Sequence, residues 1–198
     1  RLPHRTTIIM HATPIIALTG GIGCGKSFVA QLLLEENIEV YDCDAAAKRI
    51  ILTQPSIQTQ LQQLVGDCLF KDGVLRKEML TTFIQQSEQH KMAVNNIVHP
   101  AVAADFLSSG LNWFESAILF ESGFYRRLHI DKIIGVTAPL DVRIARIMQR
   151  DHISRKQALA WIASQMSQED IIAQCDYIIR NDGQADLKQQ LRSLLQWI

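Results

Sequence analysis

Eight residues near the beginning of the chain have the types and spacing needed to hold phosphate. They read GGIGCGKS from Gly20 to Ser27 and fit the pattern Gly-x-x-x-x-Gly-Lys-Ser of a P-loop. Glycines permit backbone conformations closed to residues with a Cβ, so their N–H groups can converge on oxyanions. In such a loop Lys26 reaches the β- and γ-phosphates of a nucleotide, and the hydroxyl of Ser27 holds Mg²⁺.

The segments on either side of the loop decide whether the motif counts. Ile15–Leu18 ahead of it is a short apolar run typical of a buried parallel strand. Apolar residues behind it recur at helical spacing, and a helix there adds unpaired N–H groups and the positive end of its dipole. A glycine-rich turn that binds nothing is the alternative, and this context disfavours it. We predict that ATP contacts Gly21, Gly23, Cys24, Gly25, Lys26, Ser27 and Phe28.

Five short apolar segments alternate with helical patterns along the chain. This alternation predicts an α/β fold, a parallel sheet covered by helices on both faces. The expected strands are Ile15–Thr19, Ile38–Asp42, Ala117–Glu121, Lys132–Thr137 and Tyr177–Arg180.

Two helical stretches are longer than simple connections between strands. We predict one domain over residues 12–198, with a helical insertion at 53–112 that binds a second substrate and a polar lid at 151–170. Both stretches are alternatively ordinary packed helices. Residues 1–11 show no periodicity and are expected to be a disordered or non-native leader, with Met10 as a candidate start.

Acidic residues follow two of the predicted strands. Ligands of open parallel sheets gather at the carboxyl ends of the strands, where Asp42, Asp44 and Glu121 are expected to face the P-loop and Asn181 to pass beside the adenine. Mg²⁺ and its waters need such acceptors. Two alternatives stay open: Asp44 is the N-cap of the next helix, or Glu121 is simply solvated.

The predicted helix after Pro139 carries a row of arginines. Arg143, Arg146 and Arg150 are spaced to share one face, opposite an apolar stripe formed by Leu140, Ile144 and Ile147. Arginines near a γ-phosphate neutralise the charge of the transferring group. A solvated basic face is the alternative.

Composition narrows the class of protein. Twenty basic residues balance twenty acidic ones over 198 residues, which argues weakly against a general nucleic-acid binder. The four cysteines show neither a C-x-x-C pair nor metal-ligand spacing, so we expect free thiols in the reducing cytoplasm. We see no signal peptide and no apolar run of membrane-spanning length.

From Pro14 onward the sequence resembles the dephospho-coenzyme A (dephospho-CoA) kinase family. The resemblance rests on ALTGGIGCGKS, YDCDAAAKRI, DGVLRKEML, the pair His99-Pro100, ILFE and CDYIIRNDG, in that order. It implies a three-layer P-loop kinase fold similar to that of nucleoside-monophosphate kinases. It also implies transfer of the ATP γ-phosphate, with Mg²⁺, to the ribose 3′-hydroxyl of dephospho-CoA, which yields CoA and ADP.

The resemblance also implies roles for single residues. Asp44 is the base that receives the hydroxyl proton, and the catalytic set is Lys26, Asp44 and Arg146. Arg146, Arg150 and Asn181 add to the ATP site, and the acceptor contacts are Asp42, Asp44, Lys77, His99 and Glu121. The expected protein is a monomer or weak homo-oligomer whose partners are these two small molecules, with neither nucleic acid nor membrane.

The sequence departs from the family pattern at several positions. Cys24 stands for a usual Ser, Phe28 for Thr, and Lys77 for an Arg whose planar fork Lys cannot present. The lid lacks the arginines that usually follow its Gln165. Two rival readings are another P-loop small-molecule or nucleoside-monophosphate kinase and a nucleotide-binding switch. The long insertion suits a second substrate, and the chain has no clear N-K-x-D guanine-reading motif.

Overall fold

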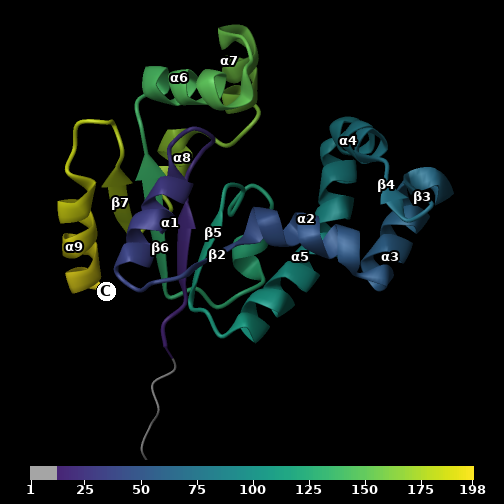
Figure 1. The fold of residues 1–198 in the computed structure, drawn as a ribbon, viewed down its shortest axis with the longest axis horizontal. Helices are drawn as coiled ribbons and strands as arrows, with labels where there is room; N and C mark the ends of the chain where they lie inside the picture. The colour runs from purple at the N-terminus through teal and green to yellow at the C-terminus, as the bar shows by residue number, and fades with distance from the viewer. Residues whose placement is uncertain (1–12) are drawn as a thin grey trace, which may run out of the picture.

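A five-stranded parallel sheet forms the centre of the computed structural model, which describes residues 13–198. Its order is β2-β5-β1-β6-β7, and every pairing is parallel (Figure 1). The strands are β1 Ile16–Thr19, β2 Val40–Asp42, β5 Trp113–Ser116, β6 Lys132–Thr137 and β7 Tyr177–Arg180. The α/β class with its parallel sheet is confirmed. The predicted leader at residues 1–11 lies outside the described residues.

Helices cover both faces of the sheet and extend beyond it. They are α1 Lys26–Glu35, α2 Cys43–Thr53, α3 Pro55–Val65, α4 Lys77–Gln85, α5 Glu88–Ser109, α6 Leu140–Asp151, α7 Arg155–Ala163, α8 Gln168–Ile172 and α9 Leu187–Trp197. Short elements between them are the 3₁₀ turns Asp67–Leu69 and Phe124–Arg126 and the hairpin of β3 Phe70–Lys71 with β4 Val74–Leu75. None of the described helices has the length and hydropathy to cross a membrane.

The central strand β1 separates two hydrophobic cores because its side chains alternate between the faces of the sheet. Ile16 and Leu18 pack with residues of α1 and α9, whereas Ala17 belongs to the core that contains α2 and α5. All four residues of β1 are buried. The loop that follows β1 therefore starts from a rigid support.

The third predicted strand is placed wrongly. The strand is Trp113–Ser116, and the expected segment Ala117–Glu121 forms a turn in which Ser122 N–H donates to the Ile118 carbonyl. Leu119 and Phe120 are apolar because their side chains are buried under this turn, not because they belong to the sheet. The error also moves Glu121 away from the strand end.

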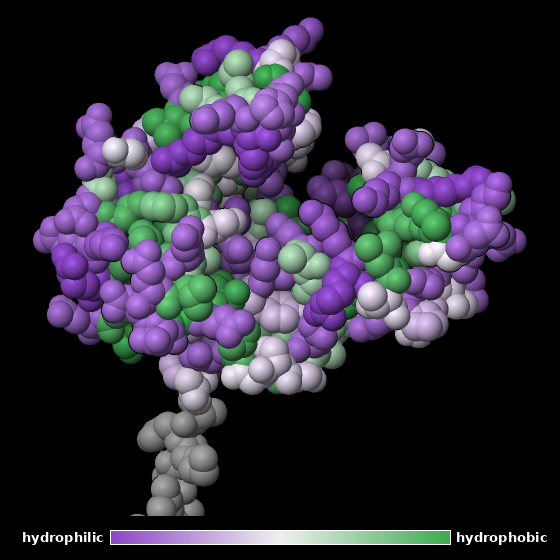
Figure 2. Space-filling model, in the orientation of Figure 1, coloured by the Kyte–Doolittle hydropathy of each residue, from purple (hydrophilic) through white to green (hydrophobic). Residues whose placement is uncertain are grey.

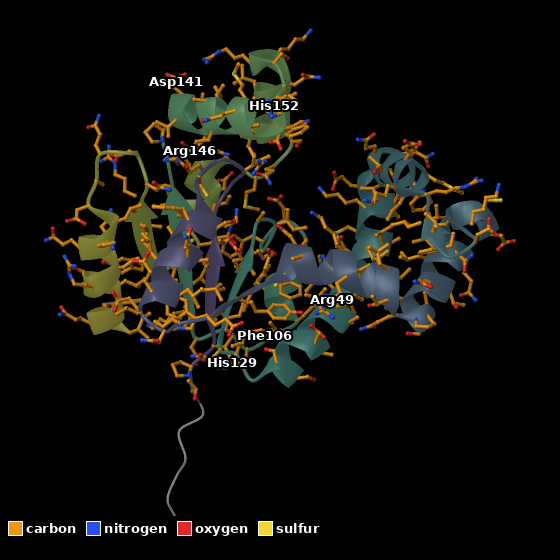
Figure 3. The ribbon with its side chains drawn as sticks, viewed as in Figure 1. Arg49, Phe106, His129, Asp141, Arg146 and His152 are labelled. Carbon is orange, nitrogen blue, oxygen red and sulfur yellow. The ribbon has the colours of Figure 1, made fainter. Side chains whose placement is uncertain are left out.

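Residues 53–112 are helical as predicted, with the small β3–β4 hairpin at their outer end (Figure 1). The long helix α5 joins this region to the sheet, since Phe106 near its end packs edge-on against Phe114 of β5 with ring centroids 5.1 Å apart. Arg49 of α2 donates to Asp105 of α5 at 2.6 Å (Figure 3). These contacts fix α2, and hence the residues at its N-terminus, relative to the strands.

Helix α6 begins after Pro139 as predicted and lies above the carboxyl edge of the sheet together with α7 (Figure 1). Ile144 and Ile147 are fully buried against Ala158 of α7, but Leu140 is 50% exposed. The predicted apolar stripe is therefore wrong at Leu140.

Candidate active site

The GGIGCGKS segment forms a loop between β1 and α1, as its sequence context predicts. Gly20, Gly23 and Gly25 have φ of 149°, 81° and 89°, a region that L side chains rarely adopt. Gly25 caps α1 in the left-handed conformation, so the loop passes directly into the helix N-terminus. The Lys26 ammonium donates to the Gly20 carbonyl at 2.8 Å, which holds the lysine across the loop.

The three arginines of α6 have three different environments. Arg143 is buried and donates from Nε to the Ile22 carbonyl at 2.9 Å, so it holds the loop by a hydrogen bond instead of lying on a solvated face. Arg146 lies between α6 and the start of α1 (Figure 3) and donates to the Cys24 carbonyl at 3.3 Å and to Asn181 Oδ1 at 3.1 Å. Burial lowers the pKa of Arg143.

Arg150 occupies the outer end of the same helix. It is exposed and forms a bidentate pair with the carboxylate of Asp151, in which Nε lies 3.1 Å from Oδ1 and Nη2 lies 2.6 Å from Oδ2. The side chains do not form one uniform basic face, and Arg146 is the arginine of α6 that bridges the P-loop and Asn181.

A cavity of about 1030 Å³ lies above the P-loop and unites most of the predicted site. Figure 2 shows the surface hollowed between the α6–α7 layer and the insertion. The predicted residues in its wall are Gly23, Gly25, Lys26, Ser27, Asp42, Asp44, Arg146 and Arg150. The cavity joins a phosphate-binding loop to carboxylates from α2 and the sheet, which is the arrangement that phosphoryl transfer to a hydroxyl requires.

The two aspartates after β2 have separate tasks. Asp42 is the N-cap of α2 and accepts a hydrogen bond from Ala45 N–H at 2.9 Å, so the alternative that Asp44 caps this helix is wrong. Asp44 lies in the first turn and faces the cavity. Desolvation raises the pKa of Asp44, an effect that the positive charge of Lys26 opposes.

Glu115 is a site residue that the sequence analysis missed. It is 8% exposed, lies directly beside Asp42 in the β2–β5 register, and lines the cavity. Its Oε2 is buried and has no hydrogen-bond partner among the described residues. Burial and then the charge of Asp42 raise the pKa of Glu115 to about 6. A charged residue directly after the apolar Trp113 and Phe114 is the sequence signal that could have indicated it.

Glu121, which was expected at a strand end, contacts the segment after α7 instead. Its carboxylate accepts from Met166 N–H at 3.0 Å, just beyond α7. The neighbouring Gln165 side chain accepts from Ile22 N–H in the P-loop at 2.7 Å. These two hydrogen bonds attach the segment after α7 to the loop and to the turn after β5. Glu121 is not part of the cavity wall.

A second chamber of about 370 Å³ opens between α2, α4 and α5. It shares Asp44, Lys48 and Ile118 with the main cavity. His99, which was expected to contact the acceptor, lies in its wall. Lys77, which was also expected to contact the acceptor, does not line this chamber. It begins α4 and borders a separate surface hollow with Arg76 and Met79.

A third hollow, of about 610 Å³, lies beside the P-loop on the side of β7 and α9. Its wall contains the exposed ring of Phe28, the apolar side chain of Leu187, and Asn181. Asn181 is buried and donates from Nδ2 to the Cys24 carbonyl at 3.0 Å. This apolar shelf meets the main cavity at Gly25 and Arg146, where a nucleotide base belongs if its phosphates occupy the loop.

The fold and this site together define a P-loop kinase. A shikimate kinase from Acinetobacter baumannii, solved in complex with shikimate, has the same fold with a TM-score of 0.57 at 15% identity, covering 93% of this chain and 92% of that one.

Comparison with known proteins then gives the family. The dephospho-CoA kinase family profile matches residues 14–186. A dephospho-CoA kinase of Bacteroides fragilis is 38% identical over 190 residues, 92% of each chain. One from Porphyromonas gingivalis is 38% identical over 84% of this chain and 85% of its own length.

Solved structures agree with the sequence comparison. The Thermus thermophilus protein TT1252 superimposes with a TM-score of 0.80 at 31% identity, covering 94% of this chain and 99% of that one. A dephospho-CoA kinase from Campylobacter jejuni does so with a TM-score of 0.62 at 25% identity, over 92% and 95% of the two chains. The chain belongs to the dephospho-CoA kinase family and is an ATP-dependent kinase.

Proposed function

We propose that this protein transfers the γ-phosphate of ATP to the ribose 3′-hydroxyl of dephospho-CoA, giving CoA and ADP. The observation that carries the proposal is that the main cavity above the P-loop and the second chamber share Asp44, Lys48 and Ile118 in their walls. A phosphate donor in the main cavity and an acceptor in the second chamber can therefore meet beside Asp44. Membership of the family supplies the identity of the acceptor.

On the donor side, backbone N–H groups of the loop hold the phosphates and the apolar shelf beside Phe28 receives the adenine. The proposed ATP contacts are Gly21, Gly23, Cys24, Gly25, Lys26, Ser27, Phe28, Arg146, Arg150 and Asn181. Lys26 and Arg146 are cations that contact the loop and also line the main cavity, and both neutralise charge on the transferring group. Arg150 must leave its pair with Asp151 to take part.

On the acceptor side, Asp44 takes the proton of the attacking hydroxyl. It lies in the cavity wall within the influence of Lys26, and its carboxylate is not used as a helix cap. Asp42 orients α2 through its cap and thereby positions Asp44. His99 lies deeper, in the second chamber of the proposed acceptor-binding insertion at 53–112. Lys77 and Glu121 lie outside both chambers, and the proposal gives them no chemical step.

The residues around the loop suit Mg²⁺, which takes oxygen ligands and keeps several of its waters. Ser27 offers a hydroxyl, while Glu115 and Asp42 offer carboxylates in the same cavity. Among residues 13–198 no group of three or more His, Cys, Asp or Glu is placed to hold a metal ion. Ser27 would hold the ion together with nucleotide phosphates, and Glu115 would accept hydrogen bonds from waters of the ion. The bound ion supplies charge neutralisation on the phosphates.

We also propose a cytoplasmic enzyme that acts as a monomer or weak homo-oligomer. The four cysteines, all within the described part of the chain, are free thiols, as suits a reducing compartment. The segment 151–170 is proposed as the lid over the nucleotide, since Gln165 already contacts the P-loop.

A coupled assay of ADP release over a panel of acceptors tests the proposed function. Dephospho-CoA should support turnover, whereas nucleoside monophosphates, sugars and a blank without acceptor should not. The phosphorus–proton couplings of the product should place the new phosphate on the 3′-oxygen. Turnover with a nucleoside monophosphate alone would favour another small-molecule kinase, and slow hydrolysis independent of acceptor would favour a switch.

A further inference from the structure

The second chamber has walls that suit a flat, uncharged group. Most of its lining is aliphatic, from α2, α4 and α5: Ala47, Ile51, Leu80, Ile84, Val94, Val98 and Val102. Phe124 adds an aromatic ring, and Lys48 is the cation in the wall. A group of high negative charge would lose its hydration here with little compensation, because burying charge costs much more than burying apolar surface.

Two side chains of this chamber carry buried polar atoms without partners. Asn95 Nδ2 and His99 Nδ1 have no hydrogen bond to any described part of the protein. They stand one helical turn apart on α5, so both project to the same side of that helix. Only 8% of the surface of His99 is exposed. Unpaired buried polar groups are costly, and a ligand that pairs with them recovers that cost.

The ligand that satisfies this pair is neutral and offers both a donor and an acceptor. Burial and the nearby charge of Arg127 lower the pKa of His99 to about 4, so the ring is uncharged at neutral pH and has one accepting nitrogen. The ring is held edge-on to Phe124, with centroids 5.3 Å apart. The Asn95 amide can donate from Nδ2. Adenine presents its 6-amino group beside ring nitrogens that accept, the edge that an Asn side chain pairs with.

The position of the chamber fits the base of the acceptor and not its diphosphate arm. With the ribose 3′-hydroxyl at Asp44, the rest of the nucleotide must continue from that point, and the chamber begins at Asp44 and Lys48. We propose that the adenine of the acceptor nucleotide occupies this chamber, with its edge read by Asn95 and His99. This inference rests on the proposed function, since that function places the ribose at Asp44.

The test changes the base and the protein in turn. Acceptors are dephospho-CoA and its analogues with hypoxanthine or with unsubstituted purine in place of adenine. Proteins are the wild type, Asn95→Leu, His99→Phe and the matched control Gln89→Leu. Gln89 also lies on α5, and it is exposed and outside the chamber. Affinity is measured by calorimetry without ATP, kcat/KM with ATP, and folding by thermal melting.

In the wild type and in Gln89→Leu, loss of the adenine edge should weaken acceptor binding and kcat/KM about tenfold or more. Asn95→Leu and His99→Phe should bind dephospho-CoA about tenfold more weakly and should distinguish the three bases much less. KM for ATP should stay unchanged in all four proteins.

Equal losses for each altered base in all four proteins would overturn the adenine assignment, as would a wild type indifferent to the base. If His99→Phe fails to fold, Asn95→Leu and the analogue series in the wild type give the same decision. Adenine-dependent binding without turnover would overturn the proposed reaction but support the adenine in the second chamber. Turnover without discrimination among the bases would support the proposed reaction but overturn the adenine assignment.

Discussion

At the scale of single residues, the carboxylates that face the P-loop divide the work among them. Asp42 is committed to its cap on α2, Asp44 is free to meet a hydroxyl, and Glu115 is buried beside Asp42 with an unpaired oxygen. The negative charge of Asp42 raises the pKa values of Glu115 and Asp44, and the positive charge of Lys26 opposes this effect. In the proposed function a divalent cation bound at the P-loop would balance these negative charges, that of Glu115 included.

Replacing Glu115 tests its contact with the waters of the metal. Glu115→Gln keeps the shape but weakens the acceptor, so Mn²⁺ should bind the enzyme–ADP complex about 10- to 100-fold more weakly, as measured by electron paramagnetic resonance. Glu121→Gln is the matched control, because that acid lies outside the cavity. Equal Mn²⁺ affinity in Glu115→Gln and the wild type would exclude Glu115 from the metal site.

At the scale of elements, α6 shows that a helical pattern predicts where side chains lie along a helix but not the role of each one. The spacing of Arg143, Arg146 and Arg150 predicted one functional face, yet the depth of the helix against the loop buries the first and exposes the last. Strand β5 gives the same lesson. Apolar residues lie on both sides of Glu115 and Ser116 between Trp113 and Phe120, and hydrophobicity alone does not show where pairing with β1 stops.

The arginines of α6 should separate stability from catalysis. Arg146→Ala should lower kcat by about 10²-fold or more, because a charged donor beside the transferring group is lost, and should leave the melting temperature nearly unchanged. Arg143→Ala should lower the free energy of unfolding by about 1–3 kcal/mol, since the Ile22 carbonyl loses its partner. Kinetics and thermal melts of both variants are the measurement. The reverse pattern would show that the two roles are exchanged.

At the scale of the whole molecule, three regions distant in sequence surround one cavity. The P-loop with its strand and helix, the five-stranded sheet and the helical insertion follow from local signals, namely the glycine pattern, the apolar runs and the helical periodicity. The second chamber does not, since it is lined by α2, α4 and α5 together. Lys77 illustrates the limit: a sequence resemblance placed it at the acceptor, but the start of α4 puts it in another hollow.

The buried His99 makes the stability of the whole fold depend on pH. Its pKa is about 4 in the folded protein, below the ordinary value of 6.5, so folding disfavours the protonated ring. The contribution of the neutral ring is complete above pH 6.5 and is lost as the pH falls toward 4, by about 3 kcal/mol. Chemical unfolding across this range should show that loss in the wild type.

The matching variants isolate the effect of His99. His99→Phe cannot be protonated, so the difference in its free energy of unfolding from the wild type should shift in its favour between pH 6.5 and 4. His129→Phe, at an exposed histidine, should follow the wild type. A parallel pH dependence in His99→Phe and the wild type would show that His99 is not buried in its neutral form.

The central claim is that phosphate leaves the P-loop for a hydroxyl held at Asp44. The most direct measurement compares kcat for Asp44→Asn and Asp42→Asn with ATP and dephospho-CoA at saturation. Asn caps a helix about as well as Asp, so Asp42→Asn should retain most of its activity and both variants should keep their melting temperature and ATP affinity. Loss of the base should lower kcat of Asp44→Asn by about 10²-fold, the low end for proton transfer because the transition state is loose. Full activity in Asp44→Asn would contradict the account.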